Sequence, residues 1–483
     1  MSKTFRPWKI DEPLLLPVTV QEFVAEDHVA RFVLSVVRDE IDLVKITGTY
    51  GSERGQPPFN PIMMTTLLLY AYCSGIYSSR RIAKACGERV DFMSIVGFDA
   101  PDFRTISDFR KRHLKALAEL FLQVLHLCAQ AGLAKLGHVA FDGTKIKANA
   151  SKHKAMSYGR MEDRATELEA EVAKWLSTAE ATDAEEDQLY GRDKTGEEMP
   201  DWVADKQRRA ERIRAAKAEL EAEAKAAAEA KLKERAAADE KREAEGRRKS
   251  GRQAAPPSTV PDAKAQKNFT DPESRIMKSK DGFVQAYNAQ AAVDAEAQII
   301  VAQDVTQSGS DCGHLLPMTD AVEANLGRRP EQVSADAGYC SEENLAGLED
   351  RNVDAYVATG RARDAVAGAA KDNGDPASSA PQPASTPTPA SSAPQPASTP
   401  TRVEAMRAKI KAGGHASPYR LRKQLPEPVF GQIKQARGFR QFLLRGLEKV
   451  RAEWALICTA HNLLKLAHRR SLSAALPLAA AAA

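Results

Sequence analysis

The middle of the chain holds a long segment that can form helix but cannot form a core. Forty consecutive residues, Lys206 to Glu245, contain neither proline nor glycine and consist largely of Ala, Glu, Lys and Arg. At 1.5 Å per residue a continuous helix here would be roughly 60 Å long. Apolar residues are sparse, since Ile213 and Leu220 lie seven apart without a sustained heptad. The segment 155–266 is therefore predicted to be a charged insertion, a long solvated helix or a loose helical hairpin, with no catalytic part.

A second segment, 361–401, also lies outside any core. It contains ASSAPQPASTPT twice, at Ala377 to Thr388 and at Ala390 to Thr401. Such a Pro/Ala/Ser/Thr composition cannot bury apolar surface and predicts an extended, disordered linker. The folded core must therefore be built from the residues around these two segments.

Strand patterns appear on both sides of the insertion. A strand is predicted in HVAFDGTKIKANA, two strands joined by a turn at Asp294 to Ala297 in GFVQAYNAQAAVDAEAQIIVAQDVT, and further strands in QVSADAGY and DAYVATG. Helical patterns lie between the later strands, in LLPMTDAVEANLG and SEENLAGLEDR. The order predicts an α/β fold in which a mixed sheet is covered by helices. Asp142 and Asp336 are then expected on neighbouring strands.

The two ends of the chain are predicted to be helical. Helices are expected in PIMMTTLLLYAYCSG, in SSRRIAKACGERV and, as one long helix, in TISDFRKRHLKALAELFLQVLHLCAQAG; a C-terminal helix is expected in RQFLLRGLEKVRAEWALICTAHNLLKL. Basic side chains lie on one side of two N-terminal helices, at Arg80, Arg81 and Lys84 and at Arg110, Lys111, Arg112 and Lys115. This pattern fits a DNA-binding helix-turn-helix and fits an ordinary helical bundle with solvated arginines equally well.

Composition excludes several classes of protein. The formal net charge of +4 is small because acidic and basic stretches cancel, so local charge carries the information. The six cysteines form no Cys-x-x-Cys pair, which argues against a disulfide framework or a zinc knuckle and favours a reducing, cytoplasmic setting. The apolar tail AALPLAAAAA is too short to span a membrane, and no Gly-x4-Gly-Lys motif predicts a nucleotide cofactor.

Three carboxylates suggest phosphodiester chemistry. Asp142 and Asp336 lie in strand patterns that are followed by turns, and Glu427 in YRLRKQLPEPVFGQIK lies at a predicted helix start, with Pro428 as the first helical residue. Carboxylates of this kind can hold paired divalent metal ions. Taken singly, each has an ordinary explanation as a turn or cap residue, and Glu448 and Glu453 are alternatives to Glu427.

Histidines offer weaker candidates. His314 beside Cys312, and His461 with Asn462, are interpreted as structural residues.

At these residues the chain resembles the DDE transposases of bacterial insertion sequences. The likeness lies in FDGTKIKANAS, in SADAGYCSEENL and in a Tyr-x2-Arg-x4-Glu-x6-Lys signature formed by Tyr419, Arg422, Glu427 and Lys434. The usual signature has three residues between Arg and Glu. Here there are four, so either Lys423 fills the basic role or the register differs locally.

The resemblance implies a ribonuclease H-like core with an N-terminal DNA-binding domain. It implies that Asp142, Asp336 and Glu427 hold two Mg²⁺ ions, which Mn²⁺ can replace, and that Tyr419, Arg422 and Lys434 contact DNA. The expected partners are double-stranded transposon ends and target DNA, bound by a homodimer that associates with the bacterial nucleoid, without membrane or nucleotide. The alternatives are a decayed or domesticated DNA-binding copy and a structure-specific nuclease.

The predicted division of the chain follows from these patterns. The N-terminal helical domain, with Arg80, Arg81 and Lys84 on its basic side, is expected to bind the DNA ends. The predicted boundaries are 1–131 for that domain, 132–154 for the first catalytic strands, 155–266 for the insertion, 267–360 for the continued core, 361–401 for the linker, 402–470 for the C-terminal catalytic helices and 471–483 for a tail.

Overall fold

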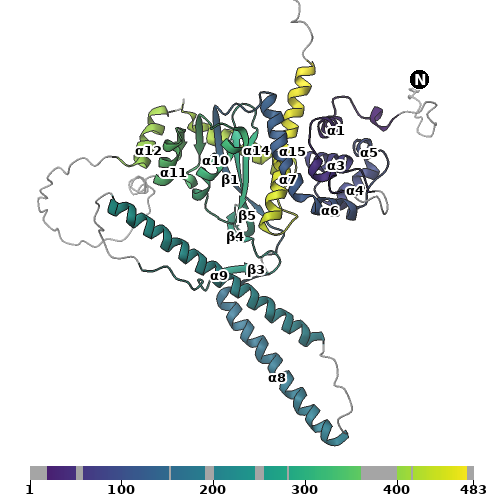
Figure 1. The fold of residues 1–483 in the computed structure, drawn as a ribbon, viewed down its shortest axis with the longest axis vertical. Coiled ribbons are helices and arrows are strands. Elements are labelled where there is room, and N and C mark those ends of the chain that lie inside the picture. The colour runs from purple at the N-terminus through teal and green to yellow at the C-terminus, as the bar shows by residue number, and fades with distance from the viewer. Residues whose placement is uncertain are drawn as a thin grey trace, which may run out of the picture.

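A central sheet has α7 (Leu114–Gln130) and α15 (Leu447–Ala475) between it and the other N-terminal helices, with α11 (Glu342–Asp350) and α12 (Arg402–Gly413) on its far side, and a helical hairpin projects from the body (Figure 1). The computed structural model describes residues 19–50, 58–151, 154–190, 201–244, 255–279, 282–360, 400–414 and 417–475. The proposed linker lies outside these residues, apart from its last two. Among the helices that the structure describes, none is both long enough and apolar enough to cross a membrane.

The main sheet is mixed, as the sequence predicts. Its strands are β1 (His138–Lys147), β4 (Arg275–Ser279), β5 (Gly282–Asp294), β6 (Ile300–Thr306), β7 (Gln332–Ala335) and β8 (Asp354–Val357). The order is β4-β5-β1-β7-β8, with β6 also paired to β5. β1 is antiparallel to β5 and parallel to β7, and β7 is parallel to β8. The prediction that the strands near Asp142 and Asp336 are neighbours is confirmed.

The β5–β6 turn forms where the sequence predicts it. The Asp294 carboxylate accepts hydrogen bonds from the backbone of Glu296, at 2.9 Å, and of Leu136, at 2.7 Å. An aspartate in a turn can in this way accept hydrogen bonds from backbone N–H groups that have no partner in the sheet. The short strands β2 (Ala155–Ser157) and β3 (Gln266–Asn268), which pair with each other, and strand β4 are additions to the predicted set.

The N-terminal region is helical, with bounds that differ in one respect from the prediction. Its helices are α1 (Val29–Asp39), α2 (Val44–Thr47), α3 (Pro61–Cys73), α4 (Ser79–Glu88), α5 (Val90–Val96), α6 (Phe103–Arg112) and α7 (Leu114–Gln130). The single long helix expected after Thr105 is wrong, because the chain breaks at His113 between α6 and α7. His113 is buried, its Nε2 lies 3.1 Å from the Tyr50 hydroxyl, and its ring packs on Phe109.

Arg110 also differs from the prediction. The sequence pattern places it on the basic side of the helix, but its side chain is buried. Its Nη1 atom donates to the Tyr77 carbonyl at 2.9 Å and to the Tyr72 hydroxyl at 3.3 Å, and its Nη2 lies 3.4 Å from the Ser79 hydroxyl. Arg110 therefore ties α6 to the end of α3 and the start of α4, and it is not available to DNA.

The later helices follow the strands. They are α10 (Leu315–Leu326), α11 (Glu342–Asp350), α12 (Arg402–Gly413), α13 (Leu421–Gln424), α14 (Pro426–Gly431) and α15 (Leu447–Ala475). Pro426 occupies the first turn of α14, one position earlier in the sequence than Glu427. The predicted role of Pro428 as the first helical residue is therefore wrong.

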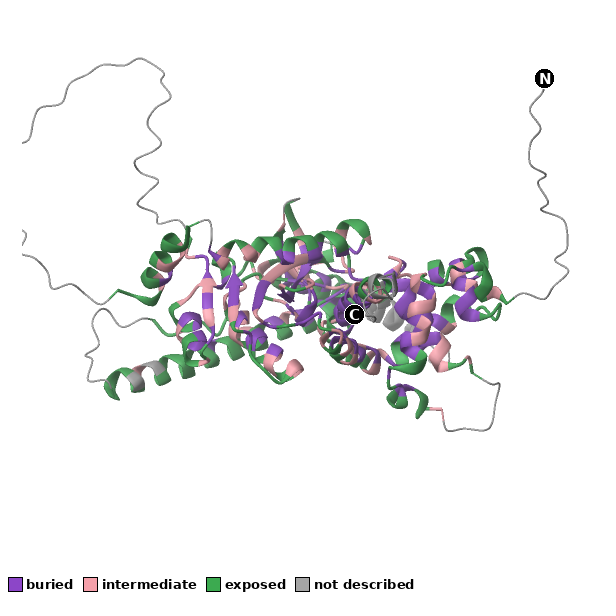
Figure 2. Cartoon of the chain, turned by 90° about the horizontal axis from the view of Figure 1, so that it is seen from above, coloured by how far each residue is buried: buried purple, intermediate pink, exposed green. Residues whose placement is uncertain are grey.

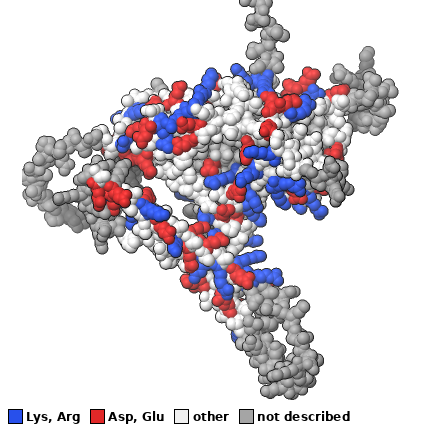
Figure 3. All heavy atoms as spheres, in the orientation of Figure 1, with Lys and Arg blue, Asp and Glu red and all other residues white. Residues whose placement is uncertain are grey.

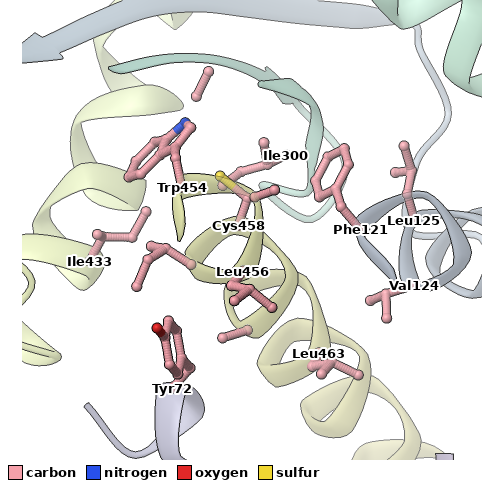
Figure 4. Close-up of a cluster of buried hydrophobic side chains, with 14 of the residues drawn as sticks. Tyr72, Phe121, Val124, Leu125, Ile300, Ile433, Trp454, Leu456, Cys458 and Leu463 are labelled. Carbon is pink, nitrogen blue, oxygen red and sulfur yellow. The ribbon is translucent and has the colours of Figure 1, made fainter. Parts of the chain in front are cut away.

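Helix α15 joins the N-terminal helices to the sheet. Figure 4 shows Trp454, Leu456 and Cys458 of α15 among side chains from α3, α7 and the sheet. Trp454 is fully buried, and its indole nitrogen donates to the Gln290 carbonyl of β5 at 3.1 Å. One continuous apolar cluster contains residues of the N-terminal helices, the sheet and α15. The N-terminal helices are thereby packed directly against the core.

The start of α15 lies later than the apolar stripe predicts. Leu443 belongs to an irregular segment and is exposed, not part of the buried stripe. The Glu453 carboxylate accepts backbone hydrogen bonds from Leu443 and Leu444, at 3.0 to 3.1 Å. Glu453 is completely buried. It therefore stabilises this segment, and the alternative that placed it in the catalytic set is not supported by its contacts.

The insertion forms two helices, α8 (Tyr158–Tyr190) and α9 (Asp201–Ala244). They pack through a small apolar cluster that is separate from the main core and includes Met161, Leu168, Ile213 and Leu220. Figure 2 shows the purple, buried residues concentrated in the sheet and the helices around it.

Candidate active site

The first two carboxylates lie at the end of a parallel strand pair. Phe141 of β1 pairs with Ala335 of β7 as the last residue pair between these strands. Asp142 and Asp336 are the residues that follow this pair in the sequence. Because paired parallel strands run in register, the two aspartates lie side by side where the pairing of β1 with β7 ends. β1 continues along β5 beyond this point, whereas β7 ends in a short 3₁₀ turn, Ala337–Tyr339.

The third carboxylate, Glu427, lies in the first turn of α14. Electrostatic coupling links the group: burial, together with the negative charges of Asp336, Asp311 and Glu427, raises the pKa of the Asp142 carboxyl to about 7. The Asp142 carboxyl is thus close enough to Asp336 and to Glu427 to be affected by the charge of each. Like charges held together in this way favour a bound cation.

The signature residues surround the same site. The Arg422 guanidinium donates to the Asp336 carboxylate at 2.5 Å and lies 4.6 Å from the centre of the Tyr419 ring. The Lys434 amine donates to the Thr144 hydroxyl at 2.5 Å and to the Lys145 carbonyl at 2.9 Å. The structure therefore brings Tyr419, Arg422 and Lys434 to the strand ends that carry the aspartates.

A pocket of about 580 Å³ opens beside Asp336. Tyr419 and Arg422 line it, and so do Lys423 and two basic residues of α12, Arg407 and Lys411. The extra residue in the signature thus leaves both Arg422 and Lys423 at the pocket. Basic side chains in a hollow next to the candidate carboxylates suit a phosphate-rich ligand.

Asp311 is a fourth acid of the site that the sequence did not reveal. Its Oδ1 accepts hydrogen bonds from Asn288, at 2.6 Å, and Gln290, at 2.8 Å, and the Lys145 amine lies 3.4 Å away. The Tyr339 hydroxyl donates to the other side of the Gln290 amide. This network connects β1 and β5 to the turn that follows Asp336. The only signal in the sequence is a loop aspartate in SGSDCGH, which resembles any turn residue.

Gly143 explains how the network fits against β1. A Cβ atom at this position would lie 2.3 Å from Gln290 Nε2 and 2.6 Å from Asp311 Oδ1. Such distances leave no room for a side chain. The glycine after Asp142 is therefore required by close packing of polar groups, not by a turn.

The remaining candidates lie elsewhere. Arg80, Arg81 and Lys84 are exposed on α4, where Arg80 lies 5.2 Å from the Phe103 ring centre and Lys84 lies 3.6 Å from Glu88. They form a surface separate from the carboxylates.

His461 and Asn462 make structural contacts, in line with the interpretation from sequence. His461 is buried, its Nε2 lies 2.9 Å from the Gln298 carbonyl, and burial lowers the pKa of its imidazole to about 3. Asn462 bonds both the amide and the carbonyl of Ile300, at 2.9 Å each. His314 lies at the start of α10 and makes no side-chain cap.

The donor set fits hard divalent cations. Three carboxylates with room for phosphate and water oxygens are what Mg²⁺ requires. Within the described ranges, no group of three or more His, Cys, Asp or Glu side chains converges on one ion position. Asp336 is instead paired with Arg422. The site thus has carboxylates suited to Mg²⁺, and one of them, Asp336, is already paired with the Arg422 guanidinium.

Comparison with protein families gave two matches. The family described as Transposase domain (DUF772) matches residues 18–112, and the family described as Transposase DDE domain matches residues 257–463. Asp336 and Glu427 lie within the second match, and Asp142 lies between the two. Searches of curated proteins and of solved structures found no match. The chain belongs to the DDE transposases of insertion sequences.

Proposed function

We propose that this transposase binds the terminal inverted repeats of its element, cleaves DNA there and joins the freed 3′-hydroxyl to target DNA. The observation that carries the proposal is the pairing of Phe141 with Ala335, since it sets Asp142 beside Asp336 where the pairing of β1 with β7 ends. The raised pKa of Asp142, caused partly by Asp336 and Glu427, supports a shared cation site. We also propose a ribonuclease H-like core, because the strand order and directions are consistent with it.

In this proposal Asp142, Asp336 and Glu427 hold two Mg²⁺ ions, for which Mn²⁺ can substitute. Bound metals of this kind activate the attacking oxygen and stabilise the leaving oxygen of an in-line displacement. The protein's own groups position the DNA. Arg422 can bind a phosphate in bidentate fashion, Lys434 supplies a point charge beside β1, and Tyr419 can stack on an unpaired base. No covalent protein intermediate is required.

Two further parts of the proposal concern partners. The exposed residues Arg80, Arg81 and Lys84 on α4 are proposed to contact the phosphates of the terminal repeats. Two copies of the chain are proposed to act together on the two ends of the element. Intact, mutually coupled carboxylates favour an enzyme over a decayed DNA-binding copy, and the Tyr/Arg/Glu/Lys signature favours a transposase over a structure-specific nuclease.

The test is cleavage and joining of duplexes that carry the DNA flanking the coding region. Asp142→Asn, Asp336→Asn and Glu427→Gln should each abolish Mg²⁺-dependent strand cleavage and leave binding of the duplex intact, because all three carboxylates share the same ions. Asp99→Asn, at an exposed position, is the control and should cleave normally. Retained cleavage in any of the three variants would remove that residue from the site.

A further inference from the structure

A second basic hollow lies at the base of the α8/α9 hairpin, apart from the carboxylates. It has a volume of about 430 Å³ and lies where α9 meets β2 and the end of β3. Its lining includes Lys154, Asp205, Arg208, Arg209, Arg212 and Phe269. Four of these side chains are cationic and one is anionic. The hollow is therefore strongly positive.

The three arginines share one side of α9. Arg212 lies four positions after Arg208 and three after Arg209, so the three side chains span an arc of about 100° on α9, and all of them line the hollow. Arg208 lies 3.6 Å from Asp205, one turn earlier, but its side chain remains 67% exposed. All three are exposed residues, and Lys154 is exposed across the hollow from them.

Several cations of the hairpin and of the strands beside it are paired with carboxylates. Pairs join α8 to α9 and α9 to the sheet: Lys206 with Glu171, Arg214 with Glu169, Lys217 with Glu162, Lys267 with Glu223 and Arg275 with Glu223. In contrast, Lys154, Arg209 and Arg212 form no ion pair with any carboxylate of the described residues, taking 4.0 Å as the longest distance for a pair. The hollow thus brings together three cations that no carboxylate of the described residues neutralises.

The hollow is built on a fixed frame. Ile213, beside Arg212, is buried in the apolar cluster that joins α8 to α9. The Phe269 amide donates to the Lys154 carbonyl at 3.0 Å, and the Asn268 side chain donates to the Ser151 carbonyl at 2.7 Å. Cations on such a frame lose less conformational entropy on binding a ligand than cations on a free helix.

The hollow also lies within a bounded distance of the candidate active site. Twelve residues separate Asp142 from Lys154, so their Cα atoms can be at most roughly 43 Å apart. At 3.4 Å per base pair, this corresponds to about 13 base pairs of duplex. Figure 3 shows Lys and Arg side chains (blue) on the N-terminal helices and near the base of the hairpin, on the same flank of the molecule.

We propose that this hollow binds the sugar-phosphate backbone of double-stranded DNA within about 13 base pairs of the cleaved bond. The inference rests on the proposed function, since it concerns the same DNA. Arginine forks bind phosphate oxygens, and a hollow of this size takes the backbone of one strand at the duplex surface. The insertion is then a second DNA-binding surface, beside that of α4.

The experiment uses the full chain and an element-end duplex. Arg208, Arg209 and Arg212 are changed together to Gln, and Lys225, Lys231 and Lys233, which are exposed further along α9, are changed to Gln in the control. Each DNA phosphate that is no longer neutralised should lower the slope of log affinity against log salt by about 0.9, so the slope of the arginine variant should fall by about two to three. The control should keep the wild-type slope. Circular dichroism of both variants confirms that α9 is retained.

Hydroxyl-radical footprinting locates the bound segment of DNA. The arginine variant should lose protection only within about 13 base pairs of the cleaved bond. An unchanged slope and footprint, with a wild type that binds and cleaves, would overturn this inference and leave the proposed function standing. A wild type that neither binds nor cleaves the element ends would instead overturn the proposed function. Weakened binding of poly-glutamate with unchanged DNA binding would show that the hollow takes an acidic protein and would also reject the inference.

Discussion

Arg422 and Asp336 form an ion pair in the middle of the candidate active site. The Arg422 Nη1 atom lies 2.5 Å from Asp336 Oδ1, although the two residues are 86 positions apart in the sequence. The Arg422 side chain is 18% exposed, and the Tyr419 ring lies beside its guanidinium. Arg422, which is expected to bind phosphate, is thus paired with Asp336, which is expected to bind metal. DNA that engages Arg422 would release Asp336, which couples DNA binding to metal binding.

Removing the Arg422 side chain should therefore change Mg²⁺ binding and DNA binding in opposite directions. Arg422→Ala should strengthen Mg²⁺ binding to the DNA-free protein by about fivefold, which corresponds to an ion pair worth about 1 kcal/mol. The same change should weaken binding of DNA. Calorimetric titration with Mg²⁺ and anisotropy titration with DNA measure the two effects, and Lys423→Ala serves as the control for removal of one positive charge at the pocket. An unaltered Mg²⁺ affinity in Arg422→Ala would show that the pair does not compete with metal.

Gly143 should be intolerant of even one methyl group. Gly143→Ala places a Cβ atom against Gln290 and Asp311, so the strand or the polar network must shift. We expect strand cleavage to fall at least about tenfold and the free energy of unfolding to fall by about 1–3 kcal/mol. The matched control is Gly137→Ala, directly before β1, where a Cβ atom would meet nothing within 4 Å. Normal cleavage by Gly143→Ala would mean that the network has no role in positioning the site.

The basic side chains of α4 should contribute to DNA affinity. Changing Arg80, Arg81 and Lys84 together to Gln should weaken binding of the element ends and lower the salt slope by about 0.9 for each phosphate that these residues neutralise. Cleavage at saturating DNA should be unaffected, since these residues lie outside the carboxylate site. Filter-binding titrations at several salt concentrations measure the slope.

A control for α4 neutralises Arg38 and Lys45, which pair with Asp39 and Glu119. Its slope should remain at the wild-type value. If the α4 variant also keeps the wild-type slope, its arginines belong to an ordinary solvated surface.

Glu453 should make stability depend on pH. Burial raises the pKa of its carboxyl from 4.5 to about 7. The folded state therefore binds a proton more tightly than the unfolded state, so this residue's stabilising contribution is complete below about pH 4.5 and is lost as the pH rises to about 7. Glu453→Gln lacks this titration. As the pH rises from about 5 to about 7.5, the melting temperature of the wild type should fall relative to that of Glu453→Gln, and thermal unfolding at several pH values measures this change.

The sequence by itself determined the strands of the core and the order of its main parts. Alternating and continuous apolar runs predict β1, β5, β6, β7 and β8 because a strand buried in a sheet needs apolar residues on one or both faces whatever its partner is. The same runs placed Asp142 within one strand and Asp336 at the end of another. Helix α9 followed from composition, because forty residues without proline or glycine leave helix as the favoured backbone state.

Tertiary structure alone decided which polar groups meet. From sequence alone, Arg110 looks like a solvated arginine. In the folded chain its guanidinium donates hydrogen bonds to Tyr72, Tyr77 and Ser79, which lie 31 to 38 positions away in the sequence. From sequence alone, Asp311 is an ordinary loop residue. In the folded chain β5, which pairs with β1, brings Asn288 and Gln290 within hydrogen-bond distance of its carboxylate.

Tertiary packing likewise determines which cations of the insertion are paired with a carboxylate. The sequence predicts a charged helix, but whether each cation has a partner depends on the element packed against it. Arg214 meets Glu169 of α8, whereas Arg209 and Arg212 face the hollow. Periodicity reports which face of an element is apolar, because that depends on neighbours a few residues away. The pairing of charges depends on residues far apart in the chain, and only the folded structure brings them together.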